Sequence, residues 1–132
     1  MDFSSLVLME KDKETGFITK ELGSFQVGEG ALFVKKFFVV DGIVSLIFDT
    51  NNDVEDWEYS AIYDLYDYDL FKENNFHIED VDDEYNPTFM VKFDYIEDYD
   101  KMKSIIEDCL SIIDETMENV FKASEGKEEE YK

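Results

Sequence analysis

The stretch ALFVKKFFVVDGIVSLIFD, residues 31–49, decides the fold class of this chain. Two runs rich in β-branched and aromatic residues, 31–40 and 43–49, flank the dipeptide Asp41-Gly42. Such residues favour strands, and Asp-Gly between two apolar runs is typical of a two-residue type I′ hairpin turn. The stretch therefore predicts an antiparallel β-hairpin.

The residues before this hairpin predict two further strands. FSSLVLMEK (3–11) and FITKELGSFQV (17–27) are separated by DKETG, in which Gly16 supplies the positive φ that a turn often needs. The glycine-rich GEG (28–30) interrupts the pattern before the next strand. We therefore expect four antiparallel strands, joined as a meander, in the first part of the chain.

The C-terminal part predicts a long amphipathic helix. From Asp98 or Asp100 as N-cap, apolar residues recur three, four, seven and eight positions apart, which gives one stripe along a helix of about six turns. The stripe consists of Met102, Ile105, Ile106, Cys109, Leu110, Ile113, Met117, Val120 and Phe121. Residues 124–132, SEGKEEEYK, lack an apolar pattern and are expected to form an acidic flexible tail.

The segment WEYSAIYDL (57–65) fits a strand better than a helix. As a helix it would carry apolar residues on two opposite faces, and both would need burial in a small domain. As a strand it places Ile62 alone on the opposite face and gathers the other large apolar residues on one face. We therefore expect a strand whose core residues are Trp57, Tyr59, Ala61, Tyr63 and Leu65.

The remaining segments complete an α+β fold for residues 1–123, expected to be a single domain. DYDLFKENN (67–75) predicts a short helical turn, FHIEDVDDE (76–84) a weak strand, and TFMVKFDY (88–95) a clear strand introduced by Pro87. The expected architecture is an antiparallel sheet or small barrel of six to seven strands with one long C-terminal helix. Its topology resembles a pleckstrin-homology-like barrel capped by a helix, and a single curved sheet fits nearly as well.

The charge of the chain is strongly negative and unevenly distributed. Thirty-four acidic residues against twelve bases, all of them lysines, give a net charge of −22. Residues 1–48 carry seven acids and five lysines (net −2), so residues 49–132 carry the other 27 acids and seven lysines (net −20). Direct binding to nucleic acid or to an anionic membrane is not expected of such a chain.

Several further features limit the location of the protein. No apolar run is long enough to span a membrane, and the N-terminus lacks the basic and small-residue signals of a secretory leader. Cys109 is the single cysteine, which excludes an internal disulfide. We therefore expect a cytoplasmic protein without a membrane partner.

The residues that catalysis requires are scarce. His77 is the single histidine, and Cys109 lies on the apolar stripe of the predicted helix, where a structural role is expected. Neither a two-histidine metal site nor a phosphate-binding glycine loop is present. We therefore expect no enzyme activity, no catalytic residue, no metal ligand and no cofactor.

Divalent-cation binding is an alternative function for so acidic a chain. Asp49, Asn51 and Asp53 occupy positions 1, 3 and 5 of an EF-hand-like spacing. However, Val54 replaces the glycine of position 6, and Ser60 replaces the bidentate glutamate of position 12. The loops 49–56 and 79–84 therefore remain weak candidates for cation binding.

The acidic region 49–100, with 18 acids and two lysines, is the best candidate for a working surface. On an extended strand Asp80, Asp82 and Glu84 would lie about 6.6 Å apart, close to two nucleic-acid base steps of about 3.4 Å each. The expected function is the binding of a basic protein surface, with mimicry of a nucleic acid as one form of it. The alternative is acidity that serves solubility alone. The expected contact residues are Tyr66, Asp67, Tyr68, Asp69, Asp80, Asp82, Asp83, Glu84 and Tyr85.

Overall fold

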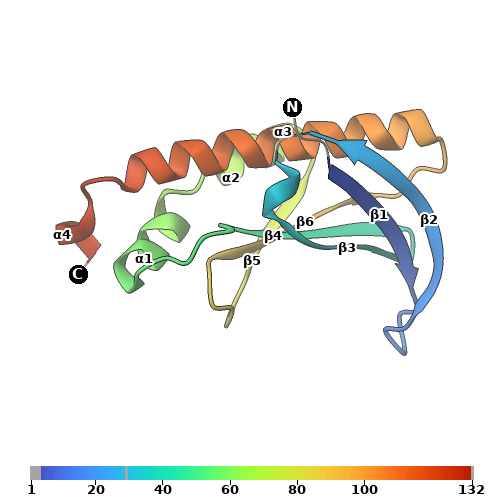
Figure 1. Cartoon of the computed structure of the whole chain (residues 1–132), viewed down its shortest axis with the longest axis horizontal. Helices are drawn as coiled ribbons and strands as arrows, with labels where there is room; N and C mark the ends of the chain where they lie inside the picture. Colours follow the sequence, from blue (N-terminus) through green and yellow to red (C-terminus); the bar gives the residue numbers. More distant parts are fainter. Residues whose placement is uncertain (1–3, 29, 132) are drawn as a thin grey trace.

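The computed structural model describes residues 4–28 and 30–131 and contains a six-stranded sheet of order β2-β1-β3-β4-β6-β5. Its strands are β1 (Ser4–Lys11), β2 (Ile18–Val27), β3 (Val34–Val40), β4 (Ile43–Asp49), β5 (His77–Val81) and β6 (Thr88–Asp94). Neighbouring strands are antiparallel except β1 and β3, which are parallel. With the long C-terminal helix, this mostly antiparallel sheet confirms the predicted α+β class (Figure 1).

The β3–β4 hairpin is confirmed, whereas the predicted meander is wrong. Asp41 and Gly42 have φ angles of 52° and 76°, the two positive values that a type I′ turn requires. However, β2 does not continue into a pairing with β3, because β1 lies between them. The sheet is open, with β2 and β5 at its edges, so it matches the expected single curved sheet rather than the pleckstrin-homology-like barrel. Phe3, the start of the first predicted strand, lies outside the described residues.

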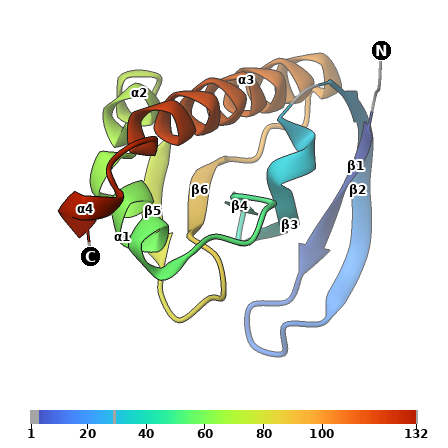
Figure 2. The same cartoon turned by 60° about the vertical axis from the view of Figure 1, so that its left-hand side comes forward.

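Helix α3 (Tyr99–Ser124) forms as its apolar stripe predicts and lies along one face of the curved sheet (Figure 2). It begins at Asp98, whose carboxylate accepts a hydrogen bond from the Lys101 amide at 3.0 Å. Its buried stripe packs with side chains of the strands, among them Leu8, Leu46 and Phe89. Burying these apolar surfaces is the main favourable contribution to the stability of the fold.

The strand predicted for 57–65 is wrong, because this segment is helix α1 (Asp56–Leu65). A reciprocal capping box starts the helix: the Glu55 side chain accepts from the backbone of Glu58, whose side chain accepts from the Glu55 amide. Of the five side chains predicted to lie in the core, Ala61 is buried. Ile62, which the strand prediction places on the opposite face, is buried as well. The remaining four, Trp57, Tyr59, Tyr63 and Leu65, are half-buried.

Three short helices complete the fold. The predicted helical turn is α2 (Tyr68–Glu73), which Asp67 caps through the Leu70 amide. The predicted strand 31–40 begins instead with the 3₁₀ helix η1 (Ala31–Phe33). The segment expected to be a flexible tail includes α4 (Glu128–Tyr131), which lies beside α1 (Figure 1).

Gly30 allows η1 to approach α3 closely. Its φ of 92° is a left-handed value, and a Cβ placed on it would overlap the backbone carbonyl oxygen of Leu110. A side chain at this position would therefore strain the backbone and push η1 away from α3.

We predict that Gly30→Ala lowers the free energy of unfolding by about 2–4 kcal/mol, through the left-handed φ and the overlap together. Urea denaturation followed by circular dichroism measures this change. Gly28→Ala is the control, because Gly28 has no positive φ and open space around its Cβ position. Equal effects of the two changes would contradict this account of Gly30.

Candidate protein-interaction surface

Three tyrosine hydroxyls join helices α1 and α2 to strands β5 and β6 and to the β5–β6 loop (residues 82–87) between them. From α1, the Tyr59 hydroxyl donates to the Glu84 carbonyl at 2.9 Å, and the Tyr63 hydroxyl accepts from the Thr88 amide at 2.8 Å. From α2, the Tyr68 hydroxyl donates to a carboxylate oxygen of Asp80 at 2.6 Å. These bonds hold the backbone of the loop in a defined position against the two helices.

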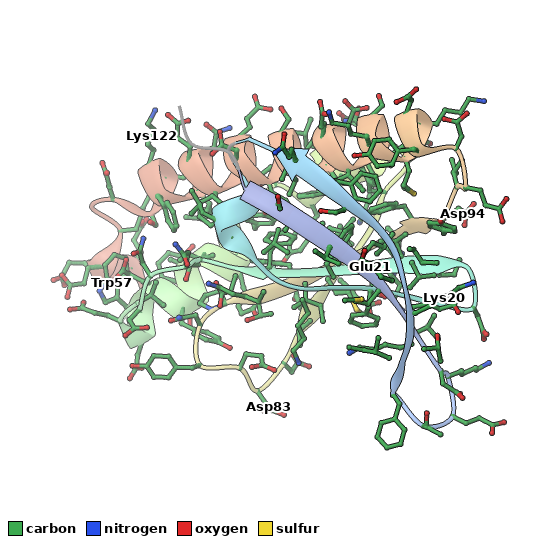
Figure 3. The ribbon with its side chains drawn as sticks, turned by 45° about the vertical axis from the view of Figure 1, so that its right-hand side comes forward. Lys20, Glu21, Trp57, Asp83, Asp94 and Lys122 are labelled. Atoms are coloured by element: carbon green, nitrogen blue, oxygen red, sulfur yellow. The ribbon has the colours of Figure 1, made fainter. Side chains whose placement is uncertain are left out.

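The same elements place many carboxylates at one end of the molecule, which we call the acidic end. It is formed by α1 with its preceding residues, α2, α4, Asp80 of β5 and the β5–β6 loop. In Figure 3, Trp57 lies at the left end of the molecule and Asp83 of the loop at its lower edge. Its basic residues are Lys72 and Lys127, and Lys127 forms an ion pair with Glu130 at 3.3 Å. Its acids are Asp53, Glu55, Asp56, Glu58, Asp64, Asp67, Asp69, Glu73, Asp80, Asp82, Asp83, Glu84, Glu128, Glu129 and Glu130.

Most of the predicted contact residues lie at this acidic end and reach its surface. Asp69, Asp82, Asp83 and Glu84 are exposed, and Tyr85 has 78% of its surface exposed. Asp67 and Asp80 are also exposed, although Asp67 caps α2 and Asp80 accepts from Tyr68. Tyr68 is half-buried, so it contributes mainly by positioning Asp80.

Tyr66 does not belong to this surface, which corrects its place among the predicted contact residues. It is 5% exposed, its ring stacks on Phe89 at 4.2 Å between centroids, and its hydroxyl lies 2.6 Å from that of Thr116 in α3. Burial raises the pKa of Tyr66 far above its ordinary value of 10.0. Tyr66 is a core residue that connects the α1–α2 segment to α3.

The even spacing predicted for Asp80, Asp82 and Glu84 is also wrong. Strand β5 ends at Val81, and the chain then turns, with Asp83 at a left-handed φ of 65°. An extended strand through all three carboxylates is therefore absent from the structure. These carboxylates therefore do not reproduce the regular spacing of nucleic-acid phosphates that an extended strand would give.

Two aromatic residues of the acidic end were not among the predicted contacts. The indole nitrogen of Trp57 donates to a carboxylate oxygen of Glu55 at 2.7 Å, so the ring lies beside the start of α1. The Tyr131 hydroxyl donates to the Asp64 carboxylate and connects α4 to α1. The capping-box pattern Glu55–Glu58 is the sequence signal that could have placed Trp57 on a helix surface.

The carboxylates of the loop before α1, residues 49–55, form contacts with other side chains and backbone amides of the protein. Asp49 accepts from the Asn51 amide at 2.8 Å and lies 3.7 Å from the Lys35 ammonium group. Asp53 accepts from the side-chain amide of Asn86 at 3.3 Å. Within residues 4–28 and 30–131, no three side chains of His, Cys, Asp or Glu converge as metal ligands would.

The two residues considered for catalysis lie in separate environments. His77 is exposed on β5, and its imidazole is 3.0 Å from the Glu79 carboxylate. Cys109 is fully buried in α3, where burial and the neighbouring Asp108 raise the pKa of its thiol. The structure therefore does not bring His77 and Cys109 together.

We predict that Tyr63→Phe releases the β5–β6 hairpin from α1. The change leaves the Thr88 amide without its hydroxyl acceptor, a loss of about 1–3 kcal/mol in a half-buried site. Amide hydrogen exchange should become faster at Thr88 and in the adjoining loop. Tyr85→Phe is the matched control, because Tyr85 is exposed; identical exchange in both variants would contradict the role of Tyr63.

We predict that the free energy of unfolding falls above about pH 9. The raised pKa values of Cys109 and Tyr66 mean that these groups ionise near 9.0 and 10.0 in the unfolded chain but stay protonated when folded. The unfolded state therefore releases protons first, and each group lowers stability by about 1.4 kcal/mol per pH unit above its ordinary pKa.

Urea denaturation between pH 7 and 11 tests this dependence. Tyr66→Phe should flatten the decline above pH 10, whereas Tyr85→Phe, at an exposed position, should leave it unchanged. An identical decline in the wild type and Tyr66→Phe would contradict the assignment to Tyr66.

Comparison with known proteins identifies the family of the chain. No curated protein and no solved structure matches the chain. No helix within the described residues is both long enough and apolar enough to cross a membrane. A family model described as a family of unknown function, DUF6762, matches residues 1–132. Because this match covers the whole of the sequence, the chain belongs to the family DUF6762.

Proposed function

We propose that this protein is a non-catalytic interaction protein whose acidic end binds a basic surface of a partner protein. The observation that supports this proposal is the fixed β5–β6 loop. The Tyr59 hydroxyl bonds the Glu84 carbonyl within the loop and the Tyr63 hydroxyl bonds Thr88, which directly follows it. The carboxylates of Asp82, Asp83 and Glu84 stay exposed. A preorganised set of charges loses less conformational entropy on binding than a mobile one.

The distribution of charge directs a basic partner to this end. The fifteen acids of the acidic end, against Lys72 and Lys127, give it a net charge of −13, more than half of the −22 of the whole chain. The field of this charge accelerates the encounter with a basic surface, and salt reduces the effect beyond a Debye length of about 10 Å at 0.1 M. Binding should therefore weaken steeply with ionic strength.

Aromatic side chains supply short-range contacts once the partner has arrived. Tyr85 projects from the loop with 78% of its surface exposed. Trp57 is half-buried at the start of α1. Tyrosine, tryptophan and arginine are the residues that most often dominate binding energy at interfaces. A partner that presents arginines would meet both carboxylates and aromatic rings at this end.

The proposal is for a cytoplasmic protein, in keeping with its single cysteine, which is buried and unpaired. A catalytic function would need a desolvated acid or base, and exposed His77 is a poor candidate for that role. A dedicated cation site would need free ligands in the 49–53 loop, whose carboxylates accept hydrogen bonds from Asn51 and Asn86. Protein binding is therefore the function that the arrangement supports best.

A triple variant, Asp82→Asn/Asp83→Asn/Glu84→Gln, tests the proposal with an octa-arginine peptide as the basic probe. Asparagine suits the left-handed φ of Asp83, so the loop should keep its shape. Trp57, the single tryptophan, lies at the acidic end and reports binding by its fluorescence. We expect affinity at 50 mM salt to fall by about tenfold, since the removed charges attract the probe directly.

The control variant, Glu14→Gln/Glu21→Gln/Glu97→Gln, removes the same charge from exposed positions outside the acidic end. It should retain most of the affinity for octa-arginine. Equal weakening by the two triple variants would show that only net charge matters and would overturn the proposed surface. Salt-insensitive binding by the wild type would overturn it as well.

A further inference from the structure

A separate pocket lies between the α2–β5 turn, the end of β6 and the side of α3. Its volume is about 330 Å³, within the range of about 300–1,000 Å³ of small-ligand pockets. Phe76, Phe93, Ile96 and Ile105 line it with apolar surface. The rings of Phe76 and Phe93 meet edge to face, with 5.5 Å between their centroids, so this apolar lining is well packed.

Carboxylates and amides provide the polar part of the pocket. Asp94 comes from the end of β6, Asp108 from α3, and Asn74 and Asn75 from the α2–β5 turn. Among the described residues, the side-chain carboxylates of Asp94 and Asp108 form no ion pair and accept no hydrogen bond, and no lysine lines the pocket. The pocket therefore combines an apolar lining with uncompensated negative charge.

The pocket adjoins the end of α2 at Asn74, but its two carboxylates lie away from α1 and the β5–β6 loop. Figure 3 shows Asp94 at the opposite end of the molecule from Trp57. Asp94 closes β6 at the end remote from the β5–β6 loop, which precedes Thr88. Binding here can therefore be separated from binding at the acidic end.

We infer that this pocket binds an organic cation, a guanidinium or ammonium group carried on an apolar stem. The stem would lie against the half-buried side chains of Phe93, Ile96 and Ile105, and the Phe93 ring also attracts a nearby cation through its π face. The charged group would meet Asp94 and Asp108, whose carboxylates accept charge-assisted hydrogen bonds. An anion would be repelled by the same carboxylates, and a neutral apolar ligand would gain no electrostatic attraction from them.

Such a cation has two possible sources, an arginine side chain of another protein or a free small amine. N-acetyl-arginine methylamide represents the first source and agmatine the second. N-acetyl-norleucine methylamide is the control, because it has an apolar stem of similar length without a charge. Each compound is titrated into the ¹⁵N-labelled full chain, and amide shifts are followed by NMR.

We expect saturable shifts of residues 74–76, 93–96 and 105–108 with the cationic compounds and weak, unsaturated shifts with the norleucine compound. The stronger of the two cations identifies the source of the natural ligand. Asp94 and Asp108 are exposed and tolerate substitution. In the Asp94→Asn/Asp108→Asn variant, the dissociation constant of the cationic compounds should rise by about fivefold. Its thermal midpoint confirms that the variant is folded.

The matched control is Asp82→Asn/Asp83→Asn, which removes two carboxylates of the acidic end and should keep the wild-type dissociation constant at the pocket. Equal binding of the norleucine compound, or shifts confined to the acidic end, would overturn the inference. So would a dissociation constant unchanged in Asp94→Asn/Asp108→Asn. Because the acidic end is tested by its own triple variant, failure at the pocket leaves the proposed function standing.

Discussion

The packing of α3 against one face of the sheet is the constraint on which the rest of the structure depends. Three parts of the chain reach this helix along its length. Tyr99 stacks on Phe25 of β2 with 4.9 Å between ring centroids, Leu110 meets Gly30 before η1, and Thr116 bonds the Tyr66 hydroxyl. Because both halves of the chain converge on one apolar stripe, α3 also sets the relative position of the acidic end and the sheet.

Local signals predicted the elements that depend on local chemistry. The Asp41-Gly42 turn, the stripe of α3 and the strand 88–95 follow from turn type and periodicity, and all three are present. The place of β1 between β2 and β3 depends on a parallel pairing of residues about 29 positions apart, such as Met9 with Phe38. No short-range pattern encodes such a contact, so the meander was a natural but wrong prediction.

The acidic end was predicted in composition but not in geometry. The objection to a helix at 57–65 was its two opposed apolar faces. Tyrosine removes this objection, because Tyr59 and Tyr63 bury part of their rings while their hydroxyls bond Glu84 of the β5–β6 loop and Thr88 directly after it. The same hydroxyls give the exposed carboxylates a rigid base. Tyr66 looked equivalent in sequence, yet it points to α3, a difference that only tertiary contacts determine.

The narrow connection of β1 to β3 has a consequence for synthesis on the ribosome. The described ladder between them joins Met9 to Phe38 and Glu10 to Val39, and α3 adds contacts through Tyr99, which stacks on Phe25 and donates to the Ser24 carbonyl at 2.9 Å. A nascent chain that has not yet released α3 exposes Phe25 and Val27 to solvent. The β1–β2 hairpin therefore completes its burial only when α3, which is synthesised after it, packs on the sheet.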